Sequence, residues 1–408
     1  MHKSFITNAI QLQQNNSTNC DEFVTGKNFP LILNITWFRL SLVKEIMNMK
    51  KLNVTLAILV AAVMAGNAQT ATSDVVGYVN QTFAAGSDTI VVPQLLRPVE
   101  FAGAVSSVSA SGGNATLICP SATFSANSFQ YAATTQPKTY YAMVTSGNLT
   151  GTGFLVVSNG TGDFTIALDG LTATSADITG IEVRPLWTLN TLFPSSSANV
   201  TFTPSTGTTT GTRRTQLVMP NFTGTGINRA ASAVYFYNPA VSDWVATTAT
   251  SVKAGDTPLV PSQYLIHRNT GGTPVQLTAS VIGSVFSKPG AMYLGTLTTG
   301  FNDTPCGLPR PTDYKLSEIG LDDTNFMQST GTTTGTRRDQ VLVYSTTGSG
   351  INRSPTAVYF KTGGSWRATT ASTTAVDPVI PAGSAIIVRK YQSDGNDRVV
   401  VNNLNVSL

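Results

Sequence analysis

The chain has 408 residues, of which 41% are hydrophobic and only 11% are charged. A typical soluble domain has roughly 25% charged residues, and here Thr, Ser, Gly and Asn take their place. These residues favour turns and exposed strand faces, so the composition indicates a β protein of roughly two to four domains. Residues 1–68 hold six of the 25 basic and three of the 21 acidic residues, which leaves a net charge of +1 on the remainder. This balance argues against a nucleic-acid or anionic-membrane partner held by bulk electrostatics.

Residues 47–68 have the three-part layout of a secretory signal peptide. Lys50 and Lys51 form a positive start, an apolar run follows at 52–65, and small residues at 66–68 suit cleavage. A transmembrane anchor is the alternative, but it needs about 20 apolar residues, and this run is shorter. We therefore predict an exported protein that is periplasmic, outer-surface or extracellular.

Residues 1–46 precede this signal and show no regular pattern. We interpret them as a mis-assigned upstream extension, with the natural start at Met47 or Met49. No second apolar stretch of membrane length follows, so we expect no transmembrane span once the signal is removed.

Residues 69–184 alternate strand-like runs with turn signals, and we predict that they form an N-terminal β-rich domain. The clearest unit is GFLVVSNGTGDFTIAL at 153–168, in which an Asn-Gly turn separates two runs. Phe164, Ile166 and Leu168 alternate with polar residues in the second run. Period-2 alternation around an Asn-Gly turn predicts a β-hairpin.

The rest of the chain contains a duplicated module, at 185–284 and 312–408, with a linker expected at 285–311. Most matching segments recur with an offset of 124 residues. Small deletions fall between later matches, and loops tolerate such changes of length. The matched segments are STGTTTGTRR at 205–214 and 329–338, GINR at 226–229 and 350–353, AVYF at 233–236 and 357–360, and Trp244 with Trp366.

Within each module, short strands follow one another at a spacing of about 8–12 residues, which is typical of a sandwich or a partly open barrel. Residues 340–344, 356–361 and 384–389 of the second module are examples. No long stretch after residue 68 has helical periodicity. We therefore predict an all-β protein, in which an N-terminal β domain is followed by two duplicated small β-sandwich or partly open barrel modules.

Several segments are similar to a known group of sequences. They are TATSDVVGYVN at 70–80, PLWTLNTLFP at 185–194, the stretch from DQVLVY to GSWR between Asp339 and Arg367, and AGSAIIVRK at 382–390. With them, the chain resembles an uncharacterised paralogous family of secreted, signal-peptide-bearing proteins of verrucomicrobial-type bacteria. The resemblance implies a cell-envelope or extracellular location, and it implies neither an activity nor functional residues.

Catalytic patterns are scarce in the sequence. His267 is the one histidine after residue 68, and Val388 takes its place in the second module. We find neither a Gly-x-Ser-x-Gly elbow nor the His/Cys spacing of a zinc site. We therefore predict that the protein is not an enzyme and holds no metal. Paired carboxylates of a glycoside hydrolase are an alternative, with Glu182, Glu318, Asp322 and Asp323 as candidates.

The arginines of the STGTTTGTRR segments are candidate ligand-binding residues. Arg213 and Arg214, with their counterparts Arg337 and Arg338, could donate to a carboxylate or sulfate. Alternatively, each segment is a Gly/Thr turn that enters a strand, with its two arginines on opposite faces. A Walker A loop is excluded because neither copy has the required lysine.

Trp244 and Trp366 would stack on sugar rings if they were exposed, and they would belong to the core if they were buried. Cys119 and Cys306 could form one disulfide in an oxidising compartment, or they could remain two buried free thiols. Both pairs of alternatives are open at the level of the sequence.

These patterns predict a secreted, non-enzymatic structural or interaction protein of the cell envelope or extracellular space. Its partners would be polysaccharide, other envelope proteins or further copies of itself. The first alternative is a carbohydrate-binding protein that captures polysaccharide through aromatics of its β modules, and the second is a secreted glycoside hydrolase. We expect no cofactor, with Ca²⁺ at the acidic loop 394–397 as the alternative, because Ca²⁺ favours oxygen ligands.

Overall fold

The computed structural model describes residues 75–196, 201–271, 273–285, 288–392 and 398–401. These residues belong to one compact unit, Asp74–Leu408. They form antiparallel sheets with very little helix, which confirms the predicted all-β class. The expected upstream extension at 1–46 and the signal segment at 47–68 lie outside the described residues. Within the described ranges, no helix has the length and apolar character needed to cross a membrane.

A seven-stranded antiparallel sheet takes its strands from residues 101–185, and we call this part of the chain the N-terminal domain, whereas residues 76–96 of the predicted range 69–184 pair with strands of the first repeat. In sheet order its strands are β4 (Phe101–Ala104), β10 (Gly180–Pro185), β7 (Tyr140–Ser146), β8 (Gly153–Asn159), β9 (Asp163–Ala167), β6 (Asn114–Ile118) and β5 (Ser107–Ser111). Alternate residues of a strand face the same side of a sheet. Phe154 on β8 and Phe164 on β9 lie on the side that faces the core. β8 and β9 pair as the hairpin that the Asn-Gly turn predicted.

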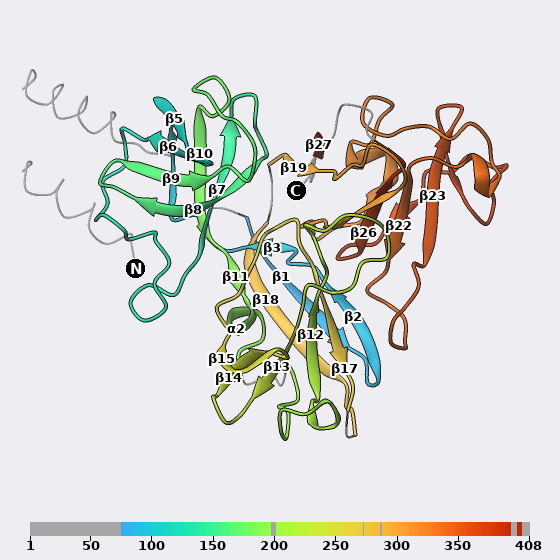
Figure 1. Cartoon of the computed structure of the whole chain (residues 1–408), viewed down its shortest axis with the longest axis horizontal. Helices are drawn as coiled ribbons and strands as arrows, with labels where there is room; N and C mark the ends of the chain where they lie inside the picture. Colours follow the sequence, from blue (N-terminus) through green and yellow to red (C-terminus); the bar gives the residue numbers. More distant parts are fainter. Residues whose placement is uncertain (1–74, 197–200, 272, 286–287, 393–397, 402–408) are drawn as a thin grey trace, which may run out of the picture. The chain divides into compact units, whose positions relative to one another are not determined.

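The first repeat is built on a six-stranded sheet that takes one strand from the start of the described chain. In sheet order the strands are β15 (Ala249–Lys253), β14 (Asp243–Ala246), β13 (Ala233–Asn238), β12 (Thr215–Met219), β17 (Leu265–Asn269) and β2 (Ser87–Val91). Figure 1 shows β2, in blue, beside β17, its antiparallel partner. The N-terminal domain is therefore an insertion between β2 and the other strands of this sheet.

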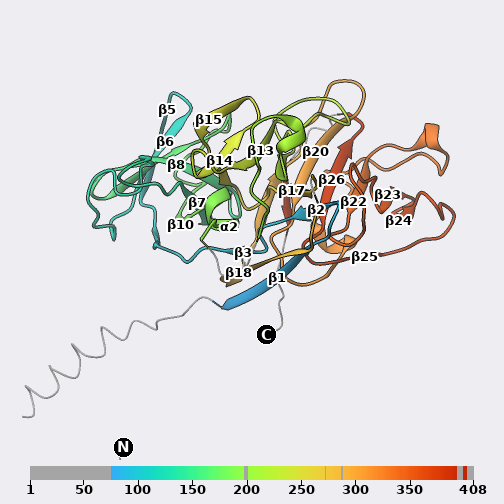
Figure 2. The ribbon, with the colours of Figure 1, turned by 90° about the horizontal axis from the view of Figure 1, so that it is seen from below.

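The second repeat has a matching sheet of five strands. In sheet order they are β20 (Asn302–Gly307), β26 (Ala385–Lys390), β22 (Gln340–Tyr344), β23 (Ala357–Thr362) and β24 (Ser365–Ala368). Asp303 of β20 lies opposite Arg389 of β26, as Asp88 of β2 lies opposite Arg268 of β17. β20 is thus the counterpart of β2, and the range 285–311, expected to be a linker, contributes a strand to the sheet. Figure 2 shows β2 beside β17, and β26 beside β22, from a second direction.

Short ribbons and single turns of helix complete both repeats. In the first, β1 (Val76–Phe83) pairs with β18 (Leu277–Val285), which also pairs with β3 (Leu95–Leu96). In the second, β19 (Gly290–Tyr293) pairs with β27 (Arg398–Val401). The remaining elements are the ribbon of β11 (Trp187–Thr188) and β16 (Pro258–Leu259), the ribbon of β21 (Tyr314–Lys315) and β25 (Val379–Ile380), the helix α2 (Leu189–Leu192), and the 3₁₀ turns η1 (Thr210–Thr212), η2 (Leu316–Ile319) and η3 (Thr334–Thr336).

Each repeat has a hydrophobic core on one face of its sheet. Trp244 is fully buried in the first core and packs against Phe193 and Phe202. Trp366 is 6% exposed in the second core and packs against Phe326. The matched tryptophans are therefore core residues, which is one of the two interpretations that the sequence left open.

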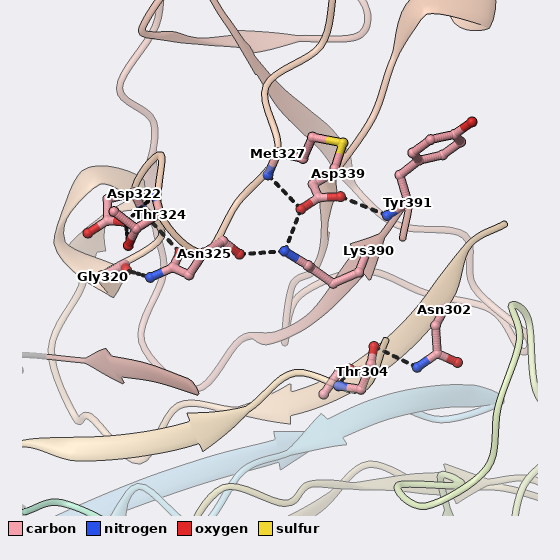
Figure 3. A network of polar contacts seen from close by, with 11 residues as sticks. Asn302, Thr304, Gly320, Asp322, Thr324, Asn325, Met327, Asp339, Lys390 and Tyr391 are labelled. Carbon is pink, nitrogen blue, oxygen red and sulfur yellow. Dashed lines mark hydrogen bonds and ion pairs between the residues drawn. The ribbon is translucent and has the colours of Figure 1, made fainter. Parts of the chain in front are cut away.

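One buried charge pair distinguishes the second repeat from the first. Asp339 lies just before β22 and Lys390 ends β26, and both side chains are shielded completely from solvent. The Lys390 Nζ lies 2.9 Å from the Asp339 carboxylate. Figure 3 shows that two backbone N–H groups also donate to this carboxylate, so the buried charge is well satisfied.

Candidate functional site

An ion pair joins two neighbouring strands of the first repeat on the sheet face that points away from its core. Arg268 on β17 donates from Nε and Nη2 to the two carboxylate oxygens of Asp88 on β2, each over 2.7 Å. Asp88 is only 5% exposed, and the hydrogen bond with its carboxylate raises the pKa of Arg268. The pair is therefore a charge-assisted, bidentate contact, which is stronger than an ordinary surface ion pair.

The GINR loop of the second repeat closes over this pair. The backbone N–H of Asp88 donates to the Gly350 carbonyl over 2.9 Å, and the backbone N–H of Asn352 donates to the Asp88 carboxylate over 2.8 Å. The side-chain oxygen of Asn352 accepts from Arg268 at 2.7 Å. Arg353 donates to the backbone carbonyl of Asp88. One aspartate thus binds a strand of its own repeat and a loop of the other.

The same contacts recur with the two repeats exchanged. Arg389 on β26 donates to both carboxylate oxygens of Asp303 on β20, over 2.7 and 2.9 Å. The backbone N–H of Asp303 donates to the Gly226 carbonyl, and that of Asn228 donates to the Asp303 carboxylate over 2.9 Å. Arg229 donates to the backbone carbonyl of Asp303. Each half consists of an Asp–Arg ion pair and the GINR loop of the other repeat. We call the two halves together the reciprocal clasp.

The residues of GINR suit the shape that the clasp requires. Asn228 and Asn352 have φ angles of 52° and 53°, in the left-handed region that Asn tolerates better than most residues. Gly226 and Gly350 also have positive φ angles, of 89° and 97°. These conformations turn a carbonyl and an N–H group of each loop toward the aspartate of the other repeat.

A cavity of about 580 Å³ is lined by residues from both halves of the clasp. Its size is suitable for a small molecule, because small-molecule sites usually have volumes of about 300–1,000 Å³. Ile90, Val218 and Ile266 of the first repeat form one part of its apolar wall. Pro305 and Ile387 of the second repeat form another part. The cavity therefore combines apolar surfaces with the charged groups of the clasp.

Two tyrosines bring unused hydroxyl groups to this cavity. Tyr264 is 4% exposed, Tyr344 is half-buried, and both line the cavity. Neither hydroxyl has a hydrogen-bond partner among the described residues. Burial raises the pKa of both tyrosines, so both remain protonated and able to donate. Both hydroxyls are therefore hydrogen-bond donors that a ligand in the cavity could use.

The two repeats differ at these tyrosines although they share the clasp. Strand pairing places Ala385 of the second repeat at the position of Tyr264 in the first. Pro220 of the first repeat stands at the position of Tyr344 in the second. The clasp therefore serves both repeats in the same way, whereas each tyrosine occurs once and makes the cavity asymmetric.

The four arginines of the STGTTTGTRR segments lie outside the residues that line this cavity. Each segment forms a turn with a short 3₁₀ helix, η1 or η3, just before strand β12 or β22. The first guanidinium lies over an aromatic ring of its own repeat, at 4.9 Å for Arg213 and 5.0 Å for Arg337. The second arginine, Arg214 or Arg338, is half-buried next to the strand. The structure does not bring the two pairs together into one site.

Cys119 and Cys306 are free thiols that lie in different hydrophobic clusters. The disulfide considered from the sequence is therefore absent, and the alternative of two buried thiols describes the structure. Burial raises the pKa of Cys119 to about 11 and that of Cys306 to about 12. Both thiols are protonated at neutral pH and are poor nucleophiles.

His267 is fully buried on β17 and is closed off from any substrate. Its ring stacks on Phe83 with centroids 3.9 Å apart, and its Nε2 lies 3.1 Å from the Thr201 carbonyl. Burial lowers the pKa of His267 to about 4, so the ring is neutral at physiological pH. These contacts are those of a core histidine.

The carboxylates considered for glycosidase chemistry have separate partners. Glu182 pairs with Arg184 and Lys288, Glu318 with Arg310, and Asp323 with Lys361, while Asp322 accepts hydrogen bonds from Thr324. Within the described ranges, no three His, Cys, Asp or Glu side chains gather into a metal site. The acidic loop at 394–397, the candidate for Ca²⁺, lies outside the described residues.

Comparison with known proteins finds no matching family model, no matching curated protein and no matching solved structure. The cavity and the reciprocal clasp are therefore the features of this chain on which a functional argument can rest.

Proposed function

We propose that the protein is an exported, non-enzymatic interaction protein of the cell envelope or extracellular space, and that it holds a small ligand between its two repeats. The observation that carries the proposal is the hydroxyl of Tyr264, a residue that is only 4% exposed in the wall of the cavity, because this hydroxyl has no hydrogen-bond partner among the described residues. Export is supported by the signal-like sequence at 47–68.

The reciprocal clasp supports this proposal because it orders both walls of the cavity without help from a ligand. Asp88 and Asp303 each hold a strand of one repeat and a loop of the other. A site whose walls are already ordered loses less conformational entropy when a ligand binds. A larger share of the contact free energy then contributes to the affinity for the ligand.

A purely structural role for the clasp is the competing explanation, in which the cavity is only a gap between packed sheets. The space is open to solvent, and its wall combines apolar side chains with tyrosine and arginine, which is the mixed lining usual for a small-molecule site. Polysaccharide capture by Trp244 and Trp366 has lost its basis, because both tryptophans are core residues.

The duplication supplies a matched pair of variants for the test. Val234 lines the cavity, whereas its counterpart Val358 is not among the lining residues, and both are half-buried on equivalent strands. Val234→Trp should fill part of the cavity, and Val358→Trp should add the same bulk elsewhere.

The wild-type chain and both variants would be dialysed against the small-molecule fraction of the culture medium of the producing cells. Compounds released by denaturation would then be identified by mass spectrometry. We expect a compound that is retained by the wild type and by Val358→Trp and is missing from Val234→Trp. Equal retention by all three proteins, or no retention by the wild type, would contradict the proposal.

A further inference from the structure

We infer that the ligand of the cavity is a small organic anion that carries an apolar ring. This inference rests on the proposed function and adds the chemical class of the ligand. Three features of the wall point to this class: its carboxylates are occupied, several of its unused polar atoms are donors, and it has more arginines than carboxylates.

The two carboxylates of the wall have little capacity left for the donors of a ligand. Asp88 accepts from Nε and Nη2 of Arg268 and from the backbone N–H of Asn352. Asp303 accepts the three corresponding N–H groups of the other half of the clasp. A carboxylate has roughly four acceptor positions, so most of them are in use. These two carboxylates therefore leave few acceptor positions for a cationic ligand.

The unused polar atoms of the wall can donate to a ligand. The hydroxyls of Tyr264 and Tyr344 have no partner among the described residues. The Nη1 groups of Arg229 and Arg268 also make no hydrogen bond within the described part of the chain. Hydrogen bonds from guanidinium groups to an ionised acceptor are shorter and stronger than neutral ones. An anionic acceptor would therefore use these donors best.

The wall also has more positive than negative side chains, since Arg229, Arg268 and Arg353 face two aspartates. The aspartates of the clasp are neutralised by their own strand partners, Arg268 and Arg389. Arg229 and Arg353 donate to backbone carbonyls and form no ion pair with a described residue. Desolvation by burial lowers the pKa of Arg229 although the charge of Asp303 opposes this shift, so the guanidinium lies partly out of water. A bound anion would offset this cost of burying a charge.

The apolar part of the wall indicates which kind of molecule carries the anionic group. Ile90 and Ile266 of the first repeat and Ile387 of the second leave hydrocarbon surface facing the cavity. A sulfate or phosphate ion alone would leave this surface in contact with water. A ring attached to the acidic group would cover it and gain the free energy of burying apolar area.

The test compares 2-naphthoate with 2-naphthamide, which have nearly the same shape and differ in charge, and includes sodium sulfate as an anion without a ring. Binding to the full chain is measured by isothermal titration calorimetry. We expect 2-naphthoate to bind at least about tenfold more tightly than 2-naphthamide, because it forms charge-assisted hydrogen bonds. Sulfate should give no saturable heat.

Variants locate the binding in the cavity. Tyr264→Phe should weaken 2-naphthoate binding about fivefold, which corresponds to one lost hydrogen bond. Val234→Trp should abolish binding, and Val358→Trp should leave it unchanged. Circular dichroism spectra equal to that of the wild type would show that each variant is folded.

The possible failures are distinct. Equal affinity for the acid and the amide, both lost in Val234→Trp, would overturn the anionic class and leave the proposed ligand cavity standing. Binding of 2-naphthoate that persists in Val234→Trp, or no binding at all, would overturn the inference itself. A failure of the proposed function would appear separately, as a wild-type chain that retains no compound after dialysis.

Discussion

Replacing Lys390 by Asn should destabilise the second repeat by several kcal/mol, because the substitution leaves an unpaired charge in the core. Lys390 and Asp339 are both fully shielded from solvent, and their charged groups are 2.9 Å apart. Removing one partner of a buried ion pair typically costs about 3–5 kcal/mol. The backbone N–H groups of Met327 and Tyr391 would still donate to Asp339, so we expect a loss near the lower limit, about 3 kcal/mol.

The loss should depend on pH in a defined direction. Burial raises the pKa of Asp339, and the hydrogen bond and charge of Lys390 oppose that rise. Without Lys390, the pKa of the folded state should rise further above that of the unfolded state. A carboxylate with a raised pKa favours the folded state at low pH and opposes it once the pH exceeds that pKa. The deficit of Lys390→Asn should therefore be largest at neutral pH and shrink in acid.

The first repeat provides the control. It has Thr215 and Asn269 at the positions of Asp339 and Lys390, so the double variant Asp339→Thr/Lys390→Asn recreates a neutral pair that the chain already uses. Replacing a buried ion pair by neutral residues is often close to neutral in stability, so the double variant should recover most of the loss.

Hydrogen–deuterium exchange of peptides from β22 and β26 would measure the unfolding free energy of this repeat locally. The wild type, the single variant and the double variant would be compared at neutral and at acidic pH. The reasoning is refuted if the single variant loses less than about 1 kcal/mol, which is the size of an ordinary surface effect. It is also refuted if the double variant loses as much as the single one.

Three further results are expected. In Asp88→Ala, the backbone amides of loop 350–353 should exchange hydrogen for deuterium at least about tenfold faster, because this loop loses its hydrogen bond to the Asp88 carboxylate. Loop 226–229 should keep its wild-type exchange rate. Equally faster exchange in both loops would contradict the clasp. His267 has a pKa of about 4 in the folded state against 6.5 as its ordinary value, so the native state binds fewer protons between these limits. Stability should fall by up to about 3 kcal/mol as the pH drops through this window, and urea unfolding of His267→Val should lack that slope. Mass spectrometry of the exported protein should detect no peptide from residues 1–46, and such a peptide would contradict the predicted signal.

The candidate site could be predicted only in part. The GINR segments at 226–229 and 350–353 were visible as repeats, but nothing near them indicated what they bind. Their partners are remote in the chain, since Asp88 lies 264 residues before Asn352. The sequence signal for these partners is the dipeptide Asp-Thr, which begins at Asp88 and again at Asp303. Two residues are too short a match to be recognised before the strand pairing is known.

The extent of the first repeat was hidden for a similar reason. β2 is separated from the rest of its sheet by the whole N-terminal domain, so the sequence offset that reveals the other matches does not extend to it. The corresponding strand β20 falls in the range that appeared to be a linker. Only pairing between strands identifies both as members of the repeats.

The sequence by itself determined the all-β class, the hairpin at 153–168 and the duplication. These follow from composition, from alternation along a strand and from matching spacing, all of which depend on residues close together in the chain. Alternation shows which face of a strand is apolar, but it does not show what covers that face. The tertiary structure alone decided that Trp244 and Trp366 are core residues, that aspartates and arginines of distant segments meet in the clasp, and that a cavity remains between the repeats. These outcomes depend on contacts between segments far apart in the sequence, which local patterns do not specify.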